Sequence, residues 1–353
     1  MRICAYRGYA TRTHVLLSGR VLANPEPRAL HNGESLWRNL VDAYHRFETD
    51  ELPDVPVTVR CEGHEATAVT DREGYYHIEL PRDAESKQTW LTAEARCNVR
   101  GEKISGTHAI AGLDDEAEFG VISDLDDTVI ETNVTKLLTA ARLTFVGHAK
   151  TRKPLEGVAA LYRSLQNGSA TRAVNPIFYV SSSPWNLYDL LCEFMELNEI
   201  PKGPMFLRDY DLSPGKLLKS GDHRQKLDRT LKIMADFPEL PFVLIGDSGQ
   251  HDAGLYAEAA TLHPQRIKAI YIRDVDPATA TKRDDHVREH IKTAAQHNVP
   301  MLLAPDSQAM AHHAAEIGLM PGRTEAEVQV EVAKDHERPS PTSAAVSEAF
   351  RME

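Results

Sequence analysis

The feature that most constrains this chain is the stretch from Glu118 to Thr128. A short apolar run over residues 119–123 leads directly into Asp124-Leu125-Asp126-Asp127-Thr128. The β-branched residues of the run predict a buried strand that ends in a charged loop. Because alternate residues of a strand face the same side, Asp124 and Asp126 should converge where the strand stops, and they repel each other unless a cation or a shared proton is present. A solvated acidic turn would carry the same residues, so this stretch alone leaves both interpretations open.

The first third of the chain has the pattern of a small β domain. Apolar and β-branched runs bounded by Gly, Pro and Asn predict strands at 14–22, 55–61, 66–70, 75–80, 90–95 and 103–107. Residues 71–74 (Asp-Arg-Glu-Gly) have the composition of a hairpin turn between two of these strands. Ser35 to Phe47 has apolar residues at helical spacing after an N-cap candidate. We predict an N-terminal β-sandwich over residues 1–117 with one inserted helix.

From residue 118 onward the pattern becomes alternating strand and helix. Short continuous apolar runs predict strands at 177–180, 241–245, 267–272 and 300–303, with helices near 184–197, 223–236, 251–261 and 283–296. This succession predicts an α/β domain over 118–320, with a parallel sheet, helices on both faces and a site at the carboxyl ends of the strands. Residues 321–353 are polar and rich in Glu, Pro and Ser, which predicts a disordered tail.

Composition limits the function classes. A net charge of -12 argues against nucleic acid as the main partner. No apolar run reaches the roughly 18 residues of a membrane span, and the N-terminus has no apolar signal region. The four cysteines lie far apart without metal-ligand spacing, so they are expected to be reduced thiols of a cytoplasmic protein.

Reactive groups follow two further strands of the predicted sheet. Ser181 and Ser182 come before Pro184, which is placed to begin a helix, so hydroxyls and free backbone N–H groups would form an anion pocket there. A Gly-permitted turn after the strand at 241–245 brings Asp247 and Asp252 to the same rim. Lys226 lies near the start of the intervening helix. Together with the first acidic pair, these groups suit Mg²⁺ and a phosphate, because Mg²⁺ prefers a few carboxylates with water and phosphate oxygens.

The order of these motifs resembles the haloacid dehalogenase (HAD) superfamily of phosphotransferases. The segment at 124–128 resembles its first motif, Ser181 its second, Lys226 its third, and the run from Gly246 to Asp252 its fourth. More closely, the stretches 181–188, 242–250 and 271–275 are similar to phosphatidate phosphatases of the fungal actin-patch-protein type and their bacterial relatives. The resemblance covers about residues 119–275 and implies a HAD-like Rossmannoid sheet.

The resemblance also implies roles for individual residues. Asp124 would be the nucleophile that forms an aspartyl-phosphate, and Asp126 the acid and base. Mg²⁺ would be held by Asp124, the backbone carbonyl of Asp126 and Asp247, with Asp252 binding it directly or through water. Phosphoryl oxygens would be bound by Ser181, Ser182, Lys226 and Thr128, and Thr128 together with Asp127 would shape the loop. For the third motif, Lys216 and Lys219 are nearby alternatives to Lys226.

The segment between Glu131 and Glu156 is basic and carries no acidic residue. Its cations are Lys136, Arg142, Lys150, Arg152 and Lys153. Apolar residues from Val134 to Phe145 fall on one helical face, as in an amphipathic helix. Each such cation near an anionic membrane is worth about 1 kcal/mol, so the segment could meet lipid head groups and deliver phosphatidate to Asp124. A helix that packs on the sheet, with its lysines in surface ion pairs, is the alternative.

The sequence therefore predicts a cytoplasmic enzyme, with peripheral contact to anionic membranes as an option. Its expected activity is Mg²⁺-dependent hydrolysis of phosphatidate to diacylglycerol and phosphate through an aspartyl-phosphate. One alternative is a phosphatase of a soluble small-molecule or protein phosphomonoester. Another is a non-catalytic interaction protein with a vestigial site.

Overall fold

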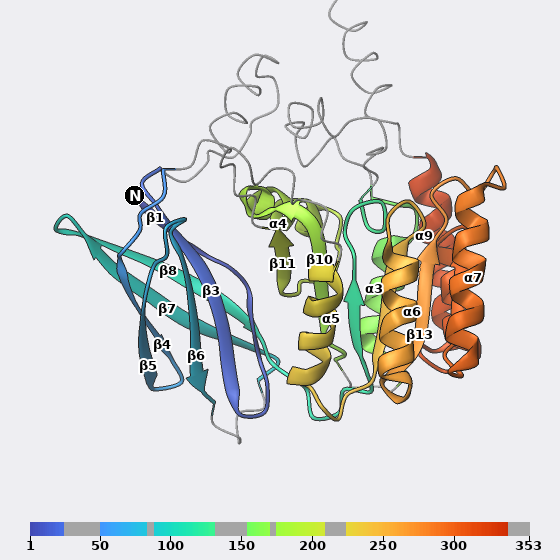
Figure 1. The fold of residues 1–353 in the computed structure, drawn as a ribbon, viewed down its shortest axis with the longest axis horizontal. Coiled ribbons are helices and arrows are strands. Elements are labelled where there is room, and N and C mark those ends of the chain that lie inside the picture. Colours follow the sequence, from blue (N-terminus) through green and yellow to red (C-terminus); the bar gives the residue numbers. More distant parts are fainter. Residues whose placement is uncertain (25–49, 83–87, 131–153, 170–173, 209–223, 338–353) are drawn as a thin grey trace, which may run out of the picture. The chain divides into compact units, whose positions relative to one another are not determined.

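The computed structural model describes residues 1–24, 50–82, 88–130, 154–169, 174–208 and 224–337 (Figure 1). The chain divides into two compact units, the first holding Met1–Asp115 and the second holding most of the chain from Glu116 onward. The helix expected at 35–47 lies outside the described residues.

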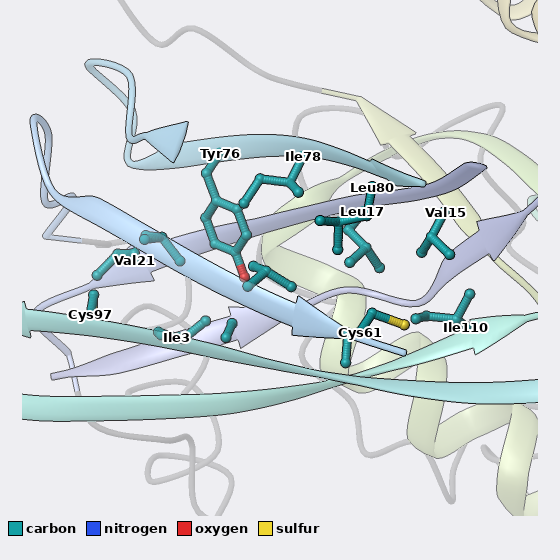
Figure 2. Packing of buried hydrophobic residues seen from close by; sticks show 14 of the residues in the cluster. Ile3, Val15, Leu17, Val21, Cys61, Tyr76, Ile78, Leu80, Cys97 and Ile110 are labelled. Atoms are coloured by element: carbon teal, nitrogen blue, oxygen red, sulfur yellow. The ribbon is translucent and has the colours of Figure 1, made fainter. Parts of the chain in front are cut away.

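The N-terminal unit is rich in β-sheet. Its strands are β1 (Arg2–Ala5), β2 (Gly8–Ala10), β3 (His14–Leu22), β4 (Pro56–Cys61), β5 (His64–Val69), β6 (Tyr75–Pro81), β7 (Trp90–Val99) and β8 (Glu102–Ala111). They form one sheet in the order β1-β3-β2-β8-β7-β4-β5, with β6 beside β3. Buried side chains of β3 and β6 meet those of β4, β7 and β8 in a single hydrophobic core (Figure 2). The sheet therefore folds over its own core, and the predicted sheet-rich character of this region is confirmed.

The turn at residues 71–74 forms, but it does not make the expected hairpin. Asp71 Oδ1 accepts hydrogen bonds from the backbone N–H groups of Glu73 and Tyr75, both at 2.9 Å, and Gly74 has a φ of 79°. However, β5 pairs with β4 and β6 pairs with β3, in both cases antiparallel. The hairpin prediction is wrong because turn chemistry is local, whereas the choice of strand partner depends on how the whole sheet covers its core.

A buried histidine lies inside the N-terminal unit. His108 is 0% exposed; its Nδ1 lies 2.7 Å from the Tyr6 carbonyl oxygen, and its Nε2 lies 2.8 Å from the Tyr76 hydroxyl. Because a carbonyl only accepts, Nδ1 carries the proton and Nε2 accepts from Tyr76. Burial lowers the pKa of His108, although the bond to Tyr6 opposes this shift. The fold therefore favours the neutral ring.

Because His108 is buried as a neutral ring, we predict that the free energy of unfolding decreases in mild acid. Above about pH 6.5, the ordinary histidine pKa, both folded and unfolded chains hold a neutral ring; below it the unfolded chain takes up a proton that the folded chain resists, so stability falls by at most about 1.4 kcal/mol per pH unit. Replacing His108 with Asn should make the unfolding temperature less dependent on pH between 5.5 and 7.5. The matched variant His77→Asn, at an exposed position, should keep the parent slope. Equal slopes for all three proteins would contradict this prediction.

The second unit is built on a six-stranded sheet. Its strands are β9 (Gly120–Ser123), β10 (Ile177–Pro184), β11 (Met205–Arg208), β12 (Phe242–Asp247), β13 (Ile267–Arg273) and β14 (Met301–Ala304). They lie in the order β11-β10-β9-β12-β13-β14, and the pairs from β10 through β14 are parallel. Every residue of β9 and β12 is buried, which explains their continuous apolar runs. The predicted parallel sheet is confirmed, and its order reverses between β9 and β12, where ligands bind in open α/β sheets.

Two groups of helices accompany this sheet. The helices are α3 (Val158–Asn167), α4 (Tyr188–Leu197), α5 (Arg224–Asp236), α6 (Asp252–Leu262), α7 (Lys282–Gln296), α8 (Ser307–Glu316) and α9 (Gly322–Glu337), with short 3₁₀ turns η3 (Trp185–Leu187) and η5 (Pro264–Arg266). Contacts join α5 to α6 and α6 to α7, whereas α3, α8 and α9 contact one another. In Figure 1, α5 and α6 lie in front of the strands and α3 lies behind them.

The disordered tail predicted over 321–353 is wrong for residues 322–337, because they form α9; residues 338–353 lie outside the described residues. Val328 of α9 is fully buried. Asp335 Oδ2 accepts a hydrogen bond from the Gly157 N–H at 3.0 Å, and Glu331 Oε1 accepts one from the Ala160 N–H at 3.2 Å. No side chain at the N-cap of α3 caps that helix, so α9 supplies the acceptors that its N-terminal N–H groups need.

We expect the Asp335→Ala variant to lose about 1–3 kcal/mol of unfolding free energy, because the substitution leaves a buried N–H without its acceptor. Urea unfolding of the full chain measures this change. Glu327→Ala makes the same kind of substitution at an exposed position of the same helix and should change stability by less than about 0.5 kcal/mol. If the two variants were equally stable, the cap would contribute nothing.

Candidate active site

Asp124 is the first residue after β9. Its backbone N–H donates to the Ile245 carbonyl of β12 at 2.9 Å, so the chain stays attached to the sheet at the point where the strand ends. The Leu125 carbonyl then accepts from the N–H groups of Val129 and Ile130, at 2.9 and 3.0 Å. Asp127 in this turn has a φ of 55°, a left-handed conformation that Asp tolerates better than most residues. The loop thus follows a fixed path around a fully buried Asp124.

Three buried carboxylates converge at this end of the sheet. Asp124, Asp247 at the end of β12 and Asp252 at the start of α6 each offer one oxygen, and these oxygens lie within 4.8 Å of one another. Gly246 makes this approach possible, because a Cβ there would lie 2.6 Å from the Asp252 Cβ. The structure therefore brings together three of the four acidic residues predicted for the site.

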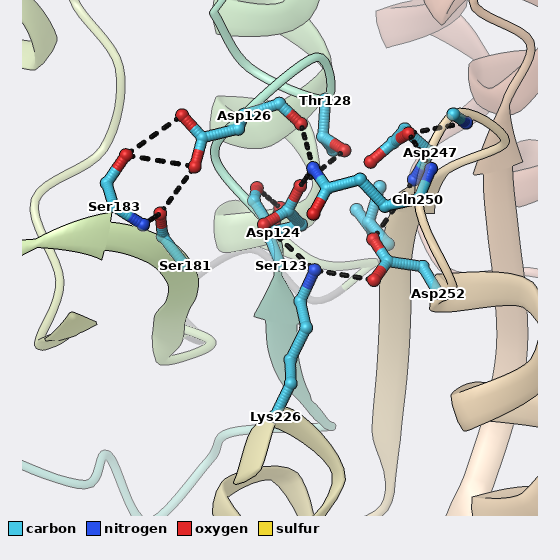
Figure 3. Close-up of polar contacts among 12 residues, drawn as sticks. Ser123, Asp124, Asp126, Thr128, Ser181, Ser183, Lys226, Asp247, Gln250 and Asp252 are labelled. Carbon is cyan, nitrogen blue, oxygen red and sulfur yellow. Dashed lines mark hydrogen bonds and ion pairs between the residues drawn. The ribbon is translucent and has the colours of Figure 1, made fainter. Parts of the chain in front are cut away.

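Lys226 joins two of these carboxylates. It projects from the start of α5, and its Nζ lies 3.0 Å from Asp124 Oδ1 and 2.5 Å from Asp252 Oδ1 (Figure 3). Burial opposes its charge, but the carboxylates of Asp124 and Asp252 raise the pKa of Lys226 well above its ordinary value. The alternatives Lys216 and Lys219 lie outside the described residues.

One ammonium cannot balance three carboxylates. Burial raises the pKa of Asp124 well above its usual range, and the charge of Lys226 only partly opposes this. Burial, followed by repulsion from Asp252, raises the pKa of Asp247 to about 7. A divalent cation would relieve this repulsion and favour the ionised forms.

The acidic cluster fits Mg²⁺. Asp247 Oδ1 accepts the backbone N–H groups of Gly249 and Gln250, at 2.6 and 2.9 Å, whereas its Oδ2 is buried and has no hydrogen-bond partner among the described residues. A buried oxygen of this kind needs a donor or a cation. Hard carboxylate oxygens at short mutual distances are ligands that Mg²⁺ prefers.

Asp126 lies apart from this cluster. Its carboxylate accepts hydrogen bonds from Ser181 Oγ at 2.7 Å and Ser183 Oγ at 3.0 Å (Figure 3). Side-by-side carboxylates of Asp124 and Asp126 were expected from strand alternation, but β9 ends at Ser123, so alternation does not extend to Asp126. The Asp126 carboxylate is held by the serines and is not one of the three that converge, although its charge contributes to the raised pKa of Asp124. The Asp126 backbone carbonyl and Asp124 Oδ2 share Gln250 as a donor.

The serines end a strand and do not begin a helix. β10 continues to Pro184, which is the N-cap of η3, and η3 runs directly into α4. The helical segment therefore begins next to Pro184 as predicted, and the serines lie in the last residues of the strand before it. Ser181 Oγ accepts the Ser183 N–H at 2.9 Å while donating to Asp126. Ser182, also on β10, is half-buried. Thr128 Oγ1 donates to Asp124 Oδ2 at 3.3 Å, so Thr128 contacts the central carboxylate directly.

Two residues of the site received no role from the sequence. Ser183 shares Asp126 with Ser181, and Gln250 donates to Asp124 Oδ2 and the Asp126 carbonyl at 3.5 and 3.4 Å. Both residues lie inside stretches that resemble the family motifs. This location was the only sequence feature that pointed to a role for Ser183 and Gln250. The five cations of the basic segment, Lys136, Arg142, Lys150, Arg152 and Lys153, lie outside the described residues.

Residues 119–274 match the family described as the catalytic domain of the phosphatidate phosphatase APP1. This segment belongs to the APP1-type catalytic-domain family. It contains every residue of the acidic cluster together with Lys226 and both serines that hold Asp126.

Two fungal proteins are similar to the chain over a larger part of it. Phosphatidate phosphatase APP1 of Saccharomyces cerevisiae is 30% identical over 257 residues, which cover 70% of this chain and 43% of that protein. Uncharacterized protein C29B5.04c of Schizosaccharomyces pombe is 31% identical over 216 residues, covering 60% of this chain and 35% of that protein. The chain thus spans less than half the length of these relatives.

The similarity to solved structures is too low to support an assignment of fold or function. A carbohydrate acetylesterase from Xanthomonas citri is 11% identical, with coverage of 82% of this chain and 72% of that chain, but its TM-score of 0.25 carries no argument about fold or function. Among the described residues, no helix combines the length and apolar character needed to cross a bilayer.

The close approach at Gly246 predicts that Gly246→Ala disrupts the cluster. The new methyl group would displace Asp252 and its contact with Lys226, and we expect a loss of about 1–3 kcal/mol of unfolding free energy, measured in urea. Gly322→Ala is the matched control, since no heavy atom lies within 4 Å of a Cβ at that glycine. Equal stability of the two variants would show that Asp252 can move without cost.

Proposed function

We propose that this protein is a Mg²⁺-dependent phosphatidate phosphatase that works through an aspartyl-phosphate on Asp124. The observation that carries the proposal is the contact of Lys226 with both Asp124 and Asp252 beside the free oxygen of Asp247. This arrangement provides a nucleophile, a cation and a metal-binding group at the switch point of a parallel sheet. The strand order and the four motifs in their order along the chain support membership of the HAD superfamily.

In the first step, a carboxylate oxygen of Asp124 attacks phosphorus in line with the ester oxygen. The new bond joins phosphorus to Asp124, and the bond from phosphorus to the diacylglycerol oxygen breaks. Asp126 protonates that leaving oxygen. Its hydrogen bonds from Ser181 and Ser183 hold the carboxyl group in one orientation for this transfer.

In the second step, Asp126 acts as the base. It takes a proton from water, the water oxygen attacks phosphorus, and the bond to Asp124 breaks to release inorganic phosphate. Asp124 returns as a carboxylate, so one difficult hydrolysis becomes two easier displacements. Lys226 and the Ser182 N–H stabilise negative charge on the phosphoryl oxygens, and Ser181 joins them only when its one hydroxyl proton turns from Asp126 to the phosphate, with Ser183 still holding Asp126. Thr128 orients Asp124.

The residues that would hold Mg²⁺ are Asp124, the backbone carbonyl of Asp126 and Asp247, with Asp252 binding directly or through water. When bound, Mg²⁺ would offset the repulsion between the Asp124 carboxylate and the phosphate. Lys226 contributes a second positive charge beside Asp124, through the 3.0 Å contact with Oδ1.

The substrate assignment is supported by the family of residues 119–274 and by the name of the yeast relative. Phosphatidate is a phosphomonoester, which matches a site with a single nucleophile and a general acid. Contact of the basic segment with an anionic membrane stays a sequence-based prediction.

Phosphate release from phosphatidate vesicles, with and without Mg²⁺, tests the proposal. Asp124→Asn should lower turnover about a thousandfold or more, because the amide is a poor nucleophile. Asp228→Asn makes the same change at an exposed position of α5 and should leave turnover unchanged. Removal of Mg²⁺ should abolish release by the parent protein.

The outcomes separate the alternatives. Turnover of a soluble phosphate ester without turnover of vesicles would keep the chemistry and reject the lipid substrate. A folded protein that binds Mg²⁺ but releases phosphate from neither substrate would indicate a non-catalytic interaction protein.

A further inference from the structure

The side chain of Gln250 lies against oxygens that the metal would use. Its Nε2 is 3.5 Å from Asp124 Oδ2 and 3.4 Å from the Asp126 backbone oxygen. A primary amide carries two N–H donors, so one group can serve both acceptors. Figure 3 shows Gln250 reaching from the loop of Asp247 toward Asp124 and Asp126.

The backbone places this amide with little freedom. Asp247 Oδ1 accepts the Gln250 N–H at 2.9 Å and the Gly249 N–H at 2.6 Å, so the turn that carries Gln250 is attached to the metal-binding carboxylate itself. A Cβ at Gly249 would lie 2.9 Å from Asp247 Oδ1, so a side chain at this position would press on the carboxylate oxygen that holds the turn. The Gln250 side chain is half-buried and therefore borders solvent into which it can turn.

We propose that Gln250 competes with Mg²⁺ for Asp124 Oδ2 and the Asp126 carbonyl, and so sets how tightly the site binds the cation. Each of these oxygens has two lone pairs. Asp124 Oδ2 also accepts the Thr128 hydroxyl at 3.3 Å, so the amide takes its second lone pair and must leave before a cation can bind there, whereas at the Asp126 carbonyl the amide competes for one of two lone pairs. Asp247 Oδ2 has no hydrogen-bond partner in the described part of the chain, the amide of Gln250 included, so the amide does not compete for this oxygen. The inference rests on the proposed function, because the competing cation is the one assigned to that site.

The competition gives Gln250 two opposite effects. Without the cation, its N–H groups stabilise the buried Asp124 carboxylate and the loop after β9. With the cation, the same bonds must be broken. Removing the amide should therefore weaken the metal-free fold and strengthen metal binding. A residue with only a structural role would weaken the fold under both conditions.

Calorimetric titration with MgCl₂, without substrate, tests the inference on the full chain. Gln250→Ala should bind Mg²⁺ about three- to tenfold more tightly than the parent, the range expected when weak hydrogen bonds no longer compete. Gln250→Asn has a side chain one methylene shorter, so it should also bind Mg²⁺ more tightly than the parent. It takes the place of the alanine variant in the titration if that variant does not fold. Gln265→Ala, at an exposed position before β13, should bind like the parent.

Thermal unfolding gives the second measurement. In EDTA the Gln250 variants should melt below the parent, and in saturating Mg²⁺ this difference should disappear or reverse. Equal or weaker Mg²⁺ binding by both variants would overturn the inference, as would a melting difference that Mg²⁺ does not change. A parent protein that binds no Mg²⁺ would overturn this inference together with the metal dependence of the proposed function. Tighter binding by the variants, in a protein without phosphatase turnover, would support the inference and reject the proposed activity.

Discussion

The contact of Lys226 with Asp124 and Asp252 is the interaction on which the site depends. It joins the end of β9, the start of α5 and the start of α6 at one buried point. Removing one partner from such a group leaves an uncompensated buried charge, which is strongly destabilising. The ion pair therefore links the start of two helices to the end of β9, and it favours an ionised Asp124 in surroundings that would otherwise favour its neutral form. Because no ammonium of the described residues forms an ion pair with Asp247, the negative charge that remains suits a divalent cation.

In Asp247 and in Asp126, some oxygens hold the surrounding loops and others face the proposed reaction site. Asp247 uses one oxygen to hold its own turn, and its other oxygen has no hydrogen-bond partner within the ranges that the structure describes. Asp126 turns its carboxylate toward two serines and its backbone carbonyl toward Gln250. Two glycines allow this crowding, Gly246 beside Asp252 and Gly249 beside Asp247. The same few atoms thus fix the loops and are proposed to carry the reaction.

Support for this arrangement extends beyond the segment that matches the family. The Arg273 guanidinium at the end of β13 donates to Ser307 Oγ, which in turn donates to the Glu156 carbonyl just before α3. The N–H of Gly157, the residue after Glu156, donates a hydrogen bond to Asp335 of α9. Composition alone suggested a disordered tail there, because the many acidic residues make the region polar. In the fold, Glu331 and Asp335 accept hydrogen bonds from N–H groups at the N-terminus of α3. Composition does not record which residues lie close together in space, so it could not predict this role.

The sequence by itself determined the central buried strands of the second unit and most of the residues that gather at the candidate site, but not α9, which lies where a disordered tail was predicted. Periodicity predicted the buried strands, and the position of each polar motif after a strand predicted that Asp124, Asp247 and Asp252 would meet at one edge. Only the tertiary structure decided which strands pair, where Asp126 points and what Gln250 contacts. The physical reason is the range of the interactions: strand and turn preferences act between neighbours in the chain, whereas pairing, helix caps across elements and the partners of buried charges depend on residues far away along the chain.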